Sequence, residues 1–198
     1  ENCSSGGLRM DYGMLSRCSI QSTSDQENYL QYAVIAANAP TGVTPEQAAV
    51  WAYPMNHEES ISPDALREEV IFNMVSAMLL RIHQSGHLAK LDEERKALVK
   101  QALSVYKTIR PDIRVSRPFW PLGLAGYSDE IVSLGLFVEG KAYLAVWKRS
   151  GAAESVTLPI SNAVRTALDS EKIALSCIYP GPETAEASYD PLEKAVKV

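Results

Sequence analysis

The sequence has few cysteines, no long hydrophobic run and no block of charge of one sign. Its 198 residues include 3 cysteines, Cys3, Cys18 and Cys177. An odd number at wide spacing fits neither a disulfide framework nor a zinc site of Cys-x-x-Cys type. We therefore expect a reducing compartment, the cytoplasm, with the cysteines unpaired, and the sequence gives no reason to expect a metal ion or other cofactor.

Charge and hydropathy exclude several kinds of partner. The formal charge of -5 comes without an acidic tail or a basic block, so we expect no nucleic-acid partner and no membrane partner. The longest apolar stretch, near Val70 to Leu80, is too short to cross about 30 Å of hydrocarbon. The first residues show no signal peptide and no initiator Met, from which we expect a fragment. A neutral, polar ligand fits this composition best.

Hydrophobic periodicity divides the first half into alternating strands and helices. Residues 18–25 and 48–53 are short apolar runs typical of buried strands. Apolar residues throughout 29–37, and at every fourth position of 63–81, predict two buried helices. A further helix begins at Asp92 to Glu94 and ends near Pro111; its expected buried face comprises Leu98, Ala102, Leu103 and Tyr106.

The composition changes after residue 112. Residues 112–128 contain two prolines and two glycines around Trp120, as in a linker anchored by an aromatic side chain. Short strand-like runs follow at 131–138, 142–148, 153–158 and 173–179.

This order of elements predicts an α/β fold of two parts. Residues 1–112 have the order of strands and helices expected of the C-terminal portion of a (β/α)8 barrel of the TIM type. After a linker at 113–128, residues 129–198 have the short strands expected of a small antiparallel β-sheet or sandwich domain. About three strand–helix units cannot close an eight-stranded barrel, which typically takes about 250 residues. We therefore expect the first part to be a piece of such a barrel.

Polar residues gather where these strands would end. In barrels of this kind the loops after the strands form the active site, so residues 1–7, 22–25 and 53–54 would converge on one pocket. Asp25 stands out, because a carboxyl group at a strand end beside aromatic residues is suited to general acid catalysis. Asp is also a favoured N-cap residue, and on these residues alone the capping interpretation is the stronger one.

Two motifs favour the catalytic interpretation. The stretch ENCSSGGLRMDYGML, followed by STSD, resembles the C-S-G-G-G-x-R-x-D and S-D-x-x-D signatures of glycoside hydrolase family 36. The later segments FWPLGLAGYSD and YLAVWKR resemble those that join the family's barrel to its terminal β-domain. The motifs keep the family's order and spacing over nearly the whole chain.

The resemblance implies a retaining α-galactosidase without a metal ion or other cofactor, acting on an α-galactoside, possibly as a homo-oligomer. In such an enzyme a carboxylate nucleophile forms a glycosyl-enzyme, and a second carboxyl group protonates the leaving oxygen and then activates water. The second role corresponds to Asp25. The sugar-binding positions correspond to Cys3, Ser5, Gly6 and Arg9, with Ser24 beside the catalytic residue.

The chain departs from the family pattern in three places. The family's nucleophile lies in a K-W-D-x-N segment, which is missing from these residues, so we expect it outside this chain. Asn28 replaces the second Asp of S-D-x-x-D, and Ser5 replaces a glycine. Glu1 and Asp11 are less suitable nucleophiles, because each has a simpler role. Glu1 is placed to orient Cys3 or the sugar, and Asp11 to pair with Arg9 or to cap the short helix expected after residue 10.

Several other residues have competing interpretations. His83 and His87 have the spacing of zinc ligands on a helix, yet Gly86 between them interrupts a helix, and a structural role is favoured. Trp51 and Tyr53 are able to stack on a sugar ring, although core packing is the simpler interpretation for Trp51. Trp120 is expected to anchor the linker.

Two other functions remain open. The chain is either a non-catalytic carbohydrate-binding or structural fragment, or part of an enzyme specific for α-N-acetylgalactosamine.

Overall fold

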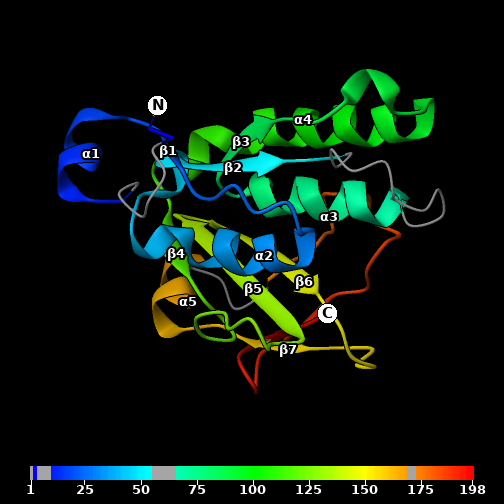
Figure 1. Cartoon of the computed structure of the whole chain (residues 1–198). Helices are drawn as coiled ribbons and strands as arrows, with labels where there is room; N and C mark the ends of the chain where they lie inside the picture. Colours follow the sequence, from blue (N-terminus) through cyan, green and yellow to red (C-terminus); the bar gives the residue numbers. More distant parts are fainter. Residues whose placement is uncertain (1, 4–9, 55–65, 169–172) are drawn as a thin grey trace.

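The computed structural model describes residues 2–3, 10–54, 66–168 and 173–198 of the chain (Figure 1). Within these ranges the chain forms one parallel sheet and two antiparallel sheets, each of three strands. This confirms the mixed α/β class. The described residues include no helix with the length and hydrophobicity that a bilayer span requires.

The parallel sheet is built from the first half of the chain. Strands β1 (Gln21–Ser22), β2 (Ala48–Ala52) and β3 (Arg81–Gln84) lie in the order β1-β2-β3. Asn2 adds a parallel bridge to Gln21 on the free edge of β1. Each strand is followed by a helix, namely α2 (Tyr29–Asn38), α3 (Leu66–Met78) and α4 (Glu93–Ile113). The short helices are α1 (Tyr12–Arg17), η1 (Ala39–Thr41), η2 (Pro45–Gln47) and η4 (Leu88–Lys90).

Local sequence explains where three of these helices begin. The side chains of Asp11, Asn28 and Asp92 accept hydrogen bonds from backbone N–H groups in the first turns of α1, α2 and α4. Such caps satisfy donors that have no partner within the helix. The predicted capping role of Asp11 is confirmed. The prediction that helix α2 covers residues 29–37 is also confirmed, and five of its residues are buried.

The helix predicted for residues 63–81 ends earlier than expected. Helix α3 stops at Met78, and β3 begins at Arg81, a strand that the sequence pattern missed. The apolar run Leu79–Leu80 continues the helical periodicity although it leads into a buried parallel strand, and periodicity does not separate these cases. Pro111 likewise does not end α4, which continues to Ile113. On the predicted buried face Leu98 and Ala102 are buried, whereas Leu103 and Tyr106 are only partly buried.

The second sheet contains the two strands predicted most accurately. Strands β5 (Ile131–Val138) and β6 (Lys141–Lys148) pair antiparallel through a hairpin at Glu139–Gly140, where Gly140 has a φ of 75°. Gly is the residue that adopts this conformation at no steric cost. Strand β4 (Arg117–Phe119) pairs with β5 and lies within the stretch expected to be a linker. Its Phe119 ring covers Gly135, where an added Cβ would lie 2.2 Å from the ring.

The third sheet and one helix differ from the all-β expectation. Strands β7 (Thr157–Pro159), β9 (Ala195–Lys197) and β8 (Ser188–Asp190) lie in that order, and α5 (Asn162–Leu168) follows β7. The strand predicted for 153–158 is thus reduced to its end. The one predicted for 173–179 is wrong, because its described residues carry no strand pairing. An isolated apolar run does not by itself provide a partner strand.

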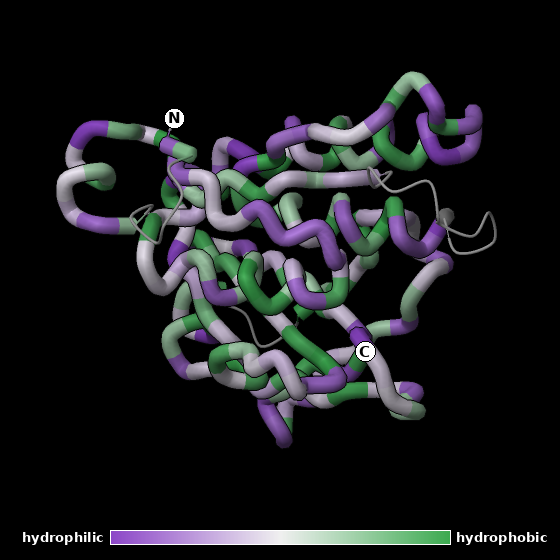
Figure 2. The backbone as a smooth tube through the Cα atoms, viewed as in Figure 1, coloured by the Kyte–Doolittle hydropathy of each residue, from purple (hydrophilic) through white to green (hydrophobic). Residues whose placement is uncertain are grey.

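Helices α2 and α3 lie between the parallel sheet and the β4–β6 sheet (Figure 1). Their buried residues share one apolar cluster with Val132, Leu134 and Leu136 of β5 and with Ala145 and Trp147 of β6. In Figure 2, much of β5 is coloured as hydrophobic, in the middle of the molecule. The boundaries 1–112, 113–128 and 129–198 stay a prediction, and the apolar core runs across them.

Three polar contacts attach the segment after α4 to helix α2. The Trp120 indole N–H donates to the Ala37 carbonyl at 2.7 Å, as expected of an anchor. The Asn38 amide donates to the Ala125 carbonyl at 2.8 Å and accepts from the Ala125 N–H at 3.0 Å. These bonds make the segment part of the packed structure.

Candidate active site

Two of the predicted segments, 22–25 and 53–54, lie at the ends of β1 and β2 on the same edge of the parallel sheet, and of residues 1–7 the structure describes Asn2 and Cys3. Thr23 N–H continues the ladder by donating to the Ala49 carbonyl at 3.0 Å, and Ser85 N–H donates to the Ala52 carbonyl at 3.0 Å. Because parallel strands end on the same side, the residues after β1, β2 and β3 share this edge. At such carboxyl ends open α/β sheets and barrels carry their ligand sites.

Asp25 is exposed and does not cap helix α2. The cap is Asn28, whose side-chain oxygen accepts from the Gln31 N–H at 3.1 Å. The alternative role for Asp25, favoured by its residue type alone, is therefore wrong. The residue that departs from the family pattern, Asn28, supplies the cap.

The loop between β1 and α2 is held by its own polar side chains. Ser24 Oγ accepts from the Gln26 N–H at 3.1 Å, and Gln26 Oε1 accepts from the Asn28 N–H at 2.9 Å. The Gln26 amide also donates to Gln31 at 2.9 Å. These contacts fold the loop around Asp25 and leave that side chain at the surface.

A buried tyrosine of α2 lies under this loop. The Tyr32 side chain is 1% exposed, and its hydroxyl lies 3.2 Å from the Ser24 carbonyl oxygen and 3.1 Å from Thr23 Oγ1. The Trp51 N–H donates to the same hydroxyl at 2.9 Å. Burial raises the pKa of Tyr32 to about 12, and the charge of Asp25 acts in the same direction. The phenol is therefore neutral at physiological pH.

Aromatic side chains line the sheet face opposite helices α2 and α3. Trp51 pairs with His83 in the ladder, and paired residues project to the same face. Their rings meet edge to face at 5.1 Å, and the Trp51 indole N–H donates to Ser22 Oγ at 3.0 Å. Tyr53 stacks beside Trp51 with ring centroids 6.4 Å apart. Trp51 is half-buried rather than a core residue, so part of its ring is accessible.

The remaining predicted site residues divide into two groups. Cys3 is exposed and follows Asn2, which accepts from the Ser22 N–H at 2.9 Å and thereby begins its segment beside β1. Ser24 is half-buried next to Asp25. The predicted positions Ser5, Gly6 and Arg9 lie outside the described residues.

The two histidines do not share a helix face. His83 lies on strand β3, and His87 follows Gly86, which has a φ of 87°. Within the described ranges no group of three or more His, Cys, Asp or Glu side chains is arranged to hold a metal ion.

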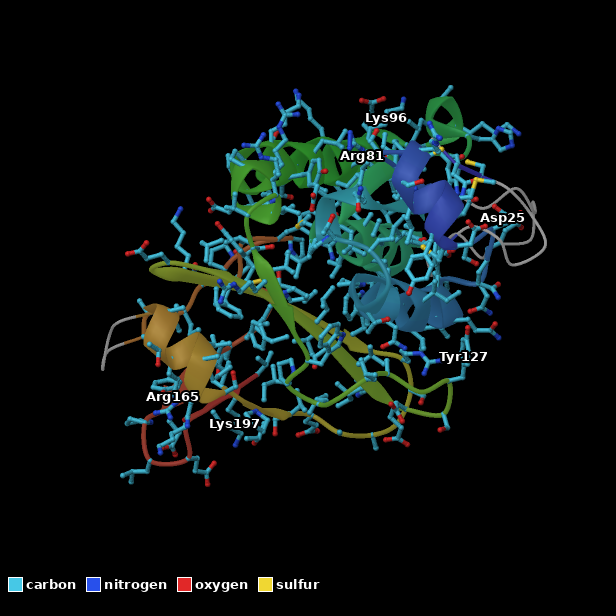
Figure 3. The ribbon with its side chains drawn as sticks, turned by 90° about the vertical axis from the view of Figure 1, so that its left-hand side faces the viewer. Asp25, Arg81, Lys96, Tyr127, Arg165 and Lys197 are labelled. Carbon is cyan, nitrogen blue, oxygen red and sulfur yellow. The ribbon has the colours of Figure 1, made fainter. Side chains whose placement is uncertain are left out.

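A cavity of about 810 Å³ lies elsewhere, beside Lys148 of β6 and Lys197 of β9. Figure 3 shows Asp25 on the opposite side of the molecule from Lys197. Asp25 does not line this cavity.

Two residues of this edge were missed at the sequence level. Tyr32 has the signal of a core residue in a buried helix, and its hydroxyl role depends on the strand ends above it. His83 was considered only as a helical metal ligand, because β3 was assigned to a helix. A tyrosine within an otherwise apolar helix is the one signal that pointed to Tyr32, since a buried hydroxyl group requires a partner.

Comparison with known proteins supports the fold. No family model matches the sequence, and no curated protein matches it significantly. Solved structures do match. A variant of the glycoside hydrolase family 36 α-galactosidase AgaA from Geobacillus stearothermophilus, in complex with raffinose, has a TM-score of 0.56 at 16% identity, over 70% of this chain and 19% of that chain.

Two further structures give the same result. The galactosidase domain of the α-galactosidase-sucrose kinase AgaSK has a TM-score of 0.56 at 18% identity, over 70% of this chain and 19% of that chain. A variant of AgaA in complex with stachyose has a TM-score of 0.55 at 18% identity, over 93% of this chain and 21% of that chain. The chain thus spans about a fifth of these α-galactosidases, and the resemblance predicted from its motifs is confirmed as a likeness in fold to part of them.

Proposed function

We propose that this chain is the C-terminal part of a retaining α-galactosidase of glycoside hydrolase family 36, with Asp25 as its general acid/base. On this proposal β1, β2 and β3 are consecutive strands of a (β/α)8 barrel, and the antiparallel sheets belong to the terminal β-domain. Strands elsewhere in the enzyme would enclose the edge that is open in this chain.

One observation carries the proposal. Asp25 follows a parallel strand at the sheet edge where such folds hold their ligands, while a different residue, Asn28, caps the next helix. An exposed carboxylate at the ligand-binding edge of a parallel sheet is a candidate for catalysis. The likeness in fold to α-galactosidases supports the same conclusion.

The proposed reaction has two steps, with Asp25 acting in each. In the first, the Asp25 carboxyl group gives its proton to the glycosidic oxygen while a carboxylate outside this chain attacks the anomeric carbon and displaces the leaving group. In the second, the Asp25 carboxylate takes a proton from water as the water oxygen attacks the anomeric carbon and releases the enzyme carboxylate. The two carboxyl groups would lie about 5 to 5.5 Å apart.

Substrate binding is assigned to small and polar groups near Asp25. We propose that Cys3, Ser5, Gly6, Arg9 and Ser24 contact the galactose hydroxyl groups, and that the accessible part of the Trp51 ring packs on the sugar. Raffinose and stachyose, the ligands in two of the similar structures, indicate oligosaccharides with a terminal α-galactose as the substrate class.

The test compares an Asp25 variant with a neighbouring carboxylate. Hydrolysis of a nitrophenyl α-galactoside is measured for this chain alone and for a protein that also carries the nucleophile strand. We expect activity only in the latter. Asp25→Asn should lower kcat about 100-fold to 10,000-fold, because general acid–base catalysis contributes that much. Glu27→Gln, an exposed carboxylate in the same loop, should leave kcat within about 2-fold.

A rescue experiment distinguishes catalysis from folding. Azide should partly restore the turnover of Asp25→Gly on substrates with good leaving groups and should yield a galactosyl azide. Retained activity in Asp25→Asn would refute the assignment. Complete inactivity of the longer protein would favour a non-catalytic carbohydrate-binding or structural role, and preference for an N-acetylgalactosaminide would change the sugar.

A further inference from the structure

Tyr32 connects the proposed catalytic loop, which follows β1, to the neighbouring strand β2. It belongs to α2, yet its hydroxyl contacts the residues that follow β1 and a residue inside β2. The hydroxyl and ring are almost completely inaccessible, with 1% of the residue exposed. A buried hydroxyl with three polar neighbours fixes the relative position of the groups around it.

The direction of each hydrogen bond follows from the available protons. The Trp51 N–H can only donate, so the Tyr32 oxygen accepts there. Thr23 Oγ1 donates its single proton to the Ala49 carbonyl at 2.9 Å. The one proton of Tyr32 is therefore available to the Ser24 carbonyl and to Thr23 Oγ1, and the Ser24 carbonyl can only accept.

The Ser24 carbonyl is the group that matters for Asp25. It belongs to the peptide unit that joins Ser24 to Asp25, so any rotation of that unit moves the Asp25 Cα and its side chain. Among the residues that the structure describes, Tyr32 donates a hydrogen bond to this carbonyl. Since Tyr32 lies on helix α2, its hydroxyl group anchors the loop to a rigid element of the fold.

We propose that Tyr32 is the positioning residue for the general acid/base Asp25, holding the Ser24–Asp25 peptide through its hydroxyl proton. This inference rests on the proposed function. Tyr32 does not contact the substrate, and its effect is on the placement of the Asp25 carboxyl group against the glycosidic oxygen. The raised pKa of Tyr32, caused by burial, keeps that proton in place at any pH at which the enzyme would act.

The test uses leaving groups of different quality. Departure of a nitrophenolate needs little protonation, whereas departure of an alcohol needs the general acid. Tyr32→Phe removes the hydroxyl and retains the ring, so the core stays filled. In the complete enzyme we expect kcat/KM to fall about 10-fold to 100-fold for methyl α-galactoside, and less than about 3-fold for the nitrophenyl substrate.

A control variant separates positioning from general destabilisation. Tyr143→Phe removes a hydroxyl that donates to Asp112 at 2.6 Å, on a strand of the antiparallel sheet. It should alter the ratio of the two rates by less than about 2-fold.

A second measurement is independent of activity. Amide hydrogen exchange of residues 23–27 should become at least about 10-fold faster in Tyr32→Phe and should be unchanged in Tyr143→Phe. Unchanged exchange in Tyr32→Phe would overturn the inference even if the protein proved inactive.

The kinetic outcomes separate this inference from the proposed function. An equal loss on both substrates in Tyr32→Phe would overturn the role of Tyr32 and leave Asp25 as the acid/base. An inactive wild-type enzyme would refute the proposed function, and exchange would then decide whether Tyr32 orders the loop.

Discussion

Arg149 joins the two halves of the chain, and its replacement tests how firmly they are coupled. The guanidinium extends from the end of β6 and donates to the Leu30 carbonyl of α2 at 2.6 Å. It also donates to the carbonyls of Gly126, Tyr127 and Asp129, at distances from 2.6 to 3.4 Å. One side chain thus links a helix of the parallel sheet to a loop and a strand of the antiparallel part.

The cost of removing these bonds follows from their kind and their exposure. A hydrogen bond to a charged group contributes about 1.5 to 3 kcal/mol. The contributions of one guanidinium do not add, and the carbonyls on its exposed side can be solvated by water when it is removed. The part-buried Leu30 carbonyl is the contact that water replaces least well. We therefore expect Arg149→Met to lower the free energy of unfolding by about 2 to 3 kcal/mol.

The assay is equilibrium unfolding in urea together with a thermal scan. The expected loss corresponds to a decrease in Tm of roughly 4 to 12 °C for a protein of this size. Arg149→Lys should recover only part of the difference, because an ammonium group cannot reach several carbonyls from one planar fork. Lys148→Met, at an exposed position of the same strand, is the matched control and should change stability by less than about 0.5 kcal/mol.

A loss below about 0.5 kcal/mol in Arg149→Met would refute the reasoning. The attachment of α2 to the antiparallel part would then depend on apolar packing alone. A lower m-value in the variant would point to a different fault, namely two halves that unfold separately.

Two further predictions concern helix α2 and alkaline pH. Asn28→Ala should destabilise the protein by about 1 kcal/mol through loss of the α2 cap, whereas Asn28→Asp retains the acceptor and should preserve stability. Equal denaturation midpoints for Asn28→Ala and the wild type would contradict a stabilising cap. Burial raises the pKa of both Tyr32 and Tyr143 to about 12, above the value of 10.0 expected in the unfolded chain. Their contribution to stability is complete below pH 10.0 and is lost as the pH rises to about 12. In that pH range the unfolding free energy of Tyr143→Phe should decline less steeply than that of the wild type. An unaltered slope would exclude ionisation of Tyr143 as a cause of the decline.

The sequence predicted the elements whose local signals agree with their packing. Helix α2, strand β2 and the β5–β6 hairpin follow from apolar pattern and turn residues alone. Strand β3 was missed because the apolar residues immediately before it, Leu79 and Leu80, continue the periodicity of α3. Strands β7, β8 and β9 are three residues each, and β7 owes its pairing to β9, far along the chain.

The candidate site shows the same division at the level of single residues. Motif and strand-end position identified Asp25, but its residue type left two roles open. The fold excluded the capping role, because it assigned the cap of α2 to Asn28, and the catalytic role stays a proposal. For Tyr32 the sequence indicated burial, and the fold added the neighbours that give its hydroxyl a function.

The sequence by itself determined the α/β class, the approximate order of elements and the loop on which Asp25 lies. These depend on the periodicity of side chains along a few turns of helix or a single strand. The tertiary structure decided which strand edges meet, which side chain caps the helix and which hydroxyl supports the loop. Such decisions need contacts between residues far apart in the chain, and local sequence carries no record of those distances.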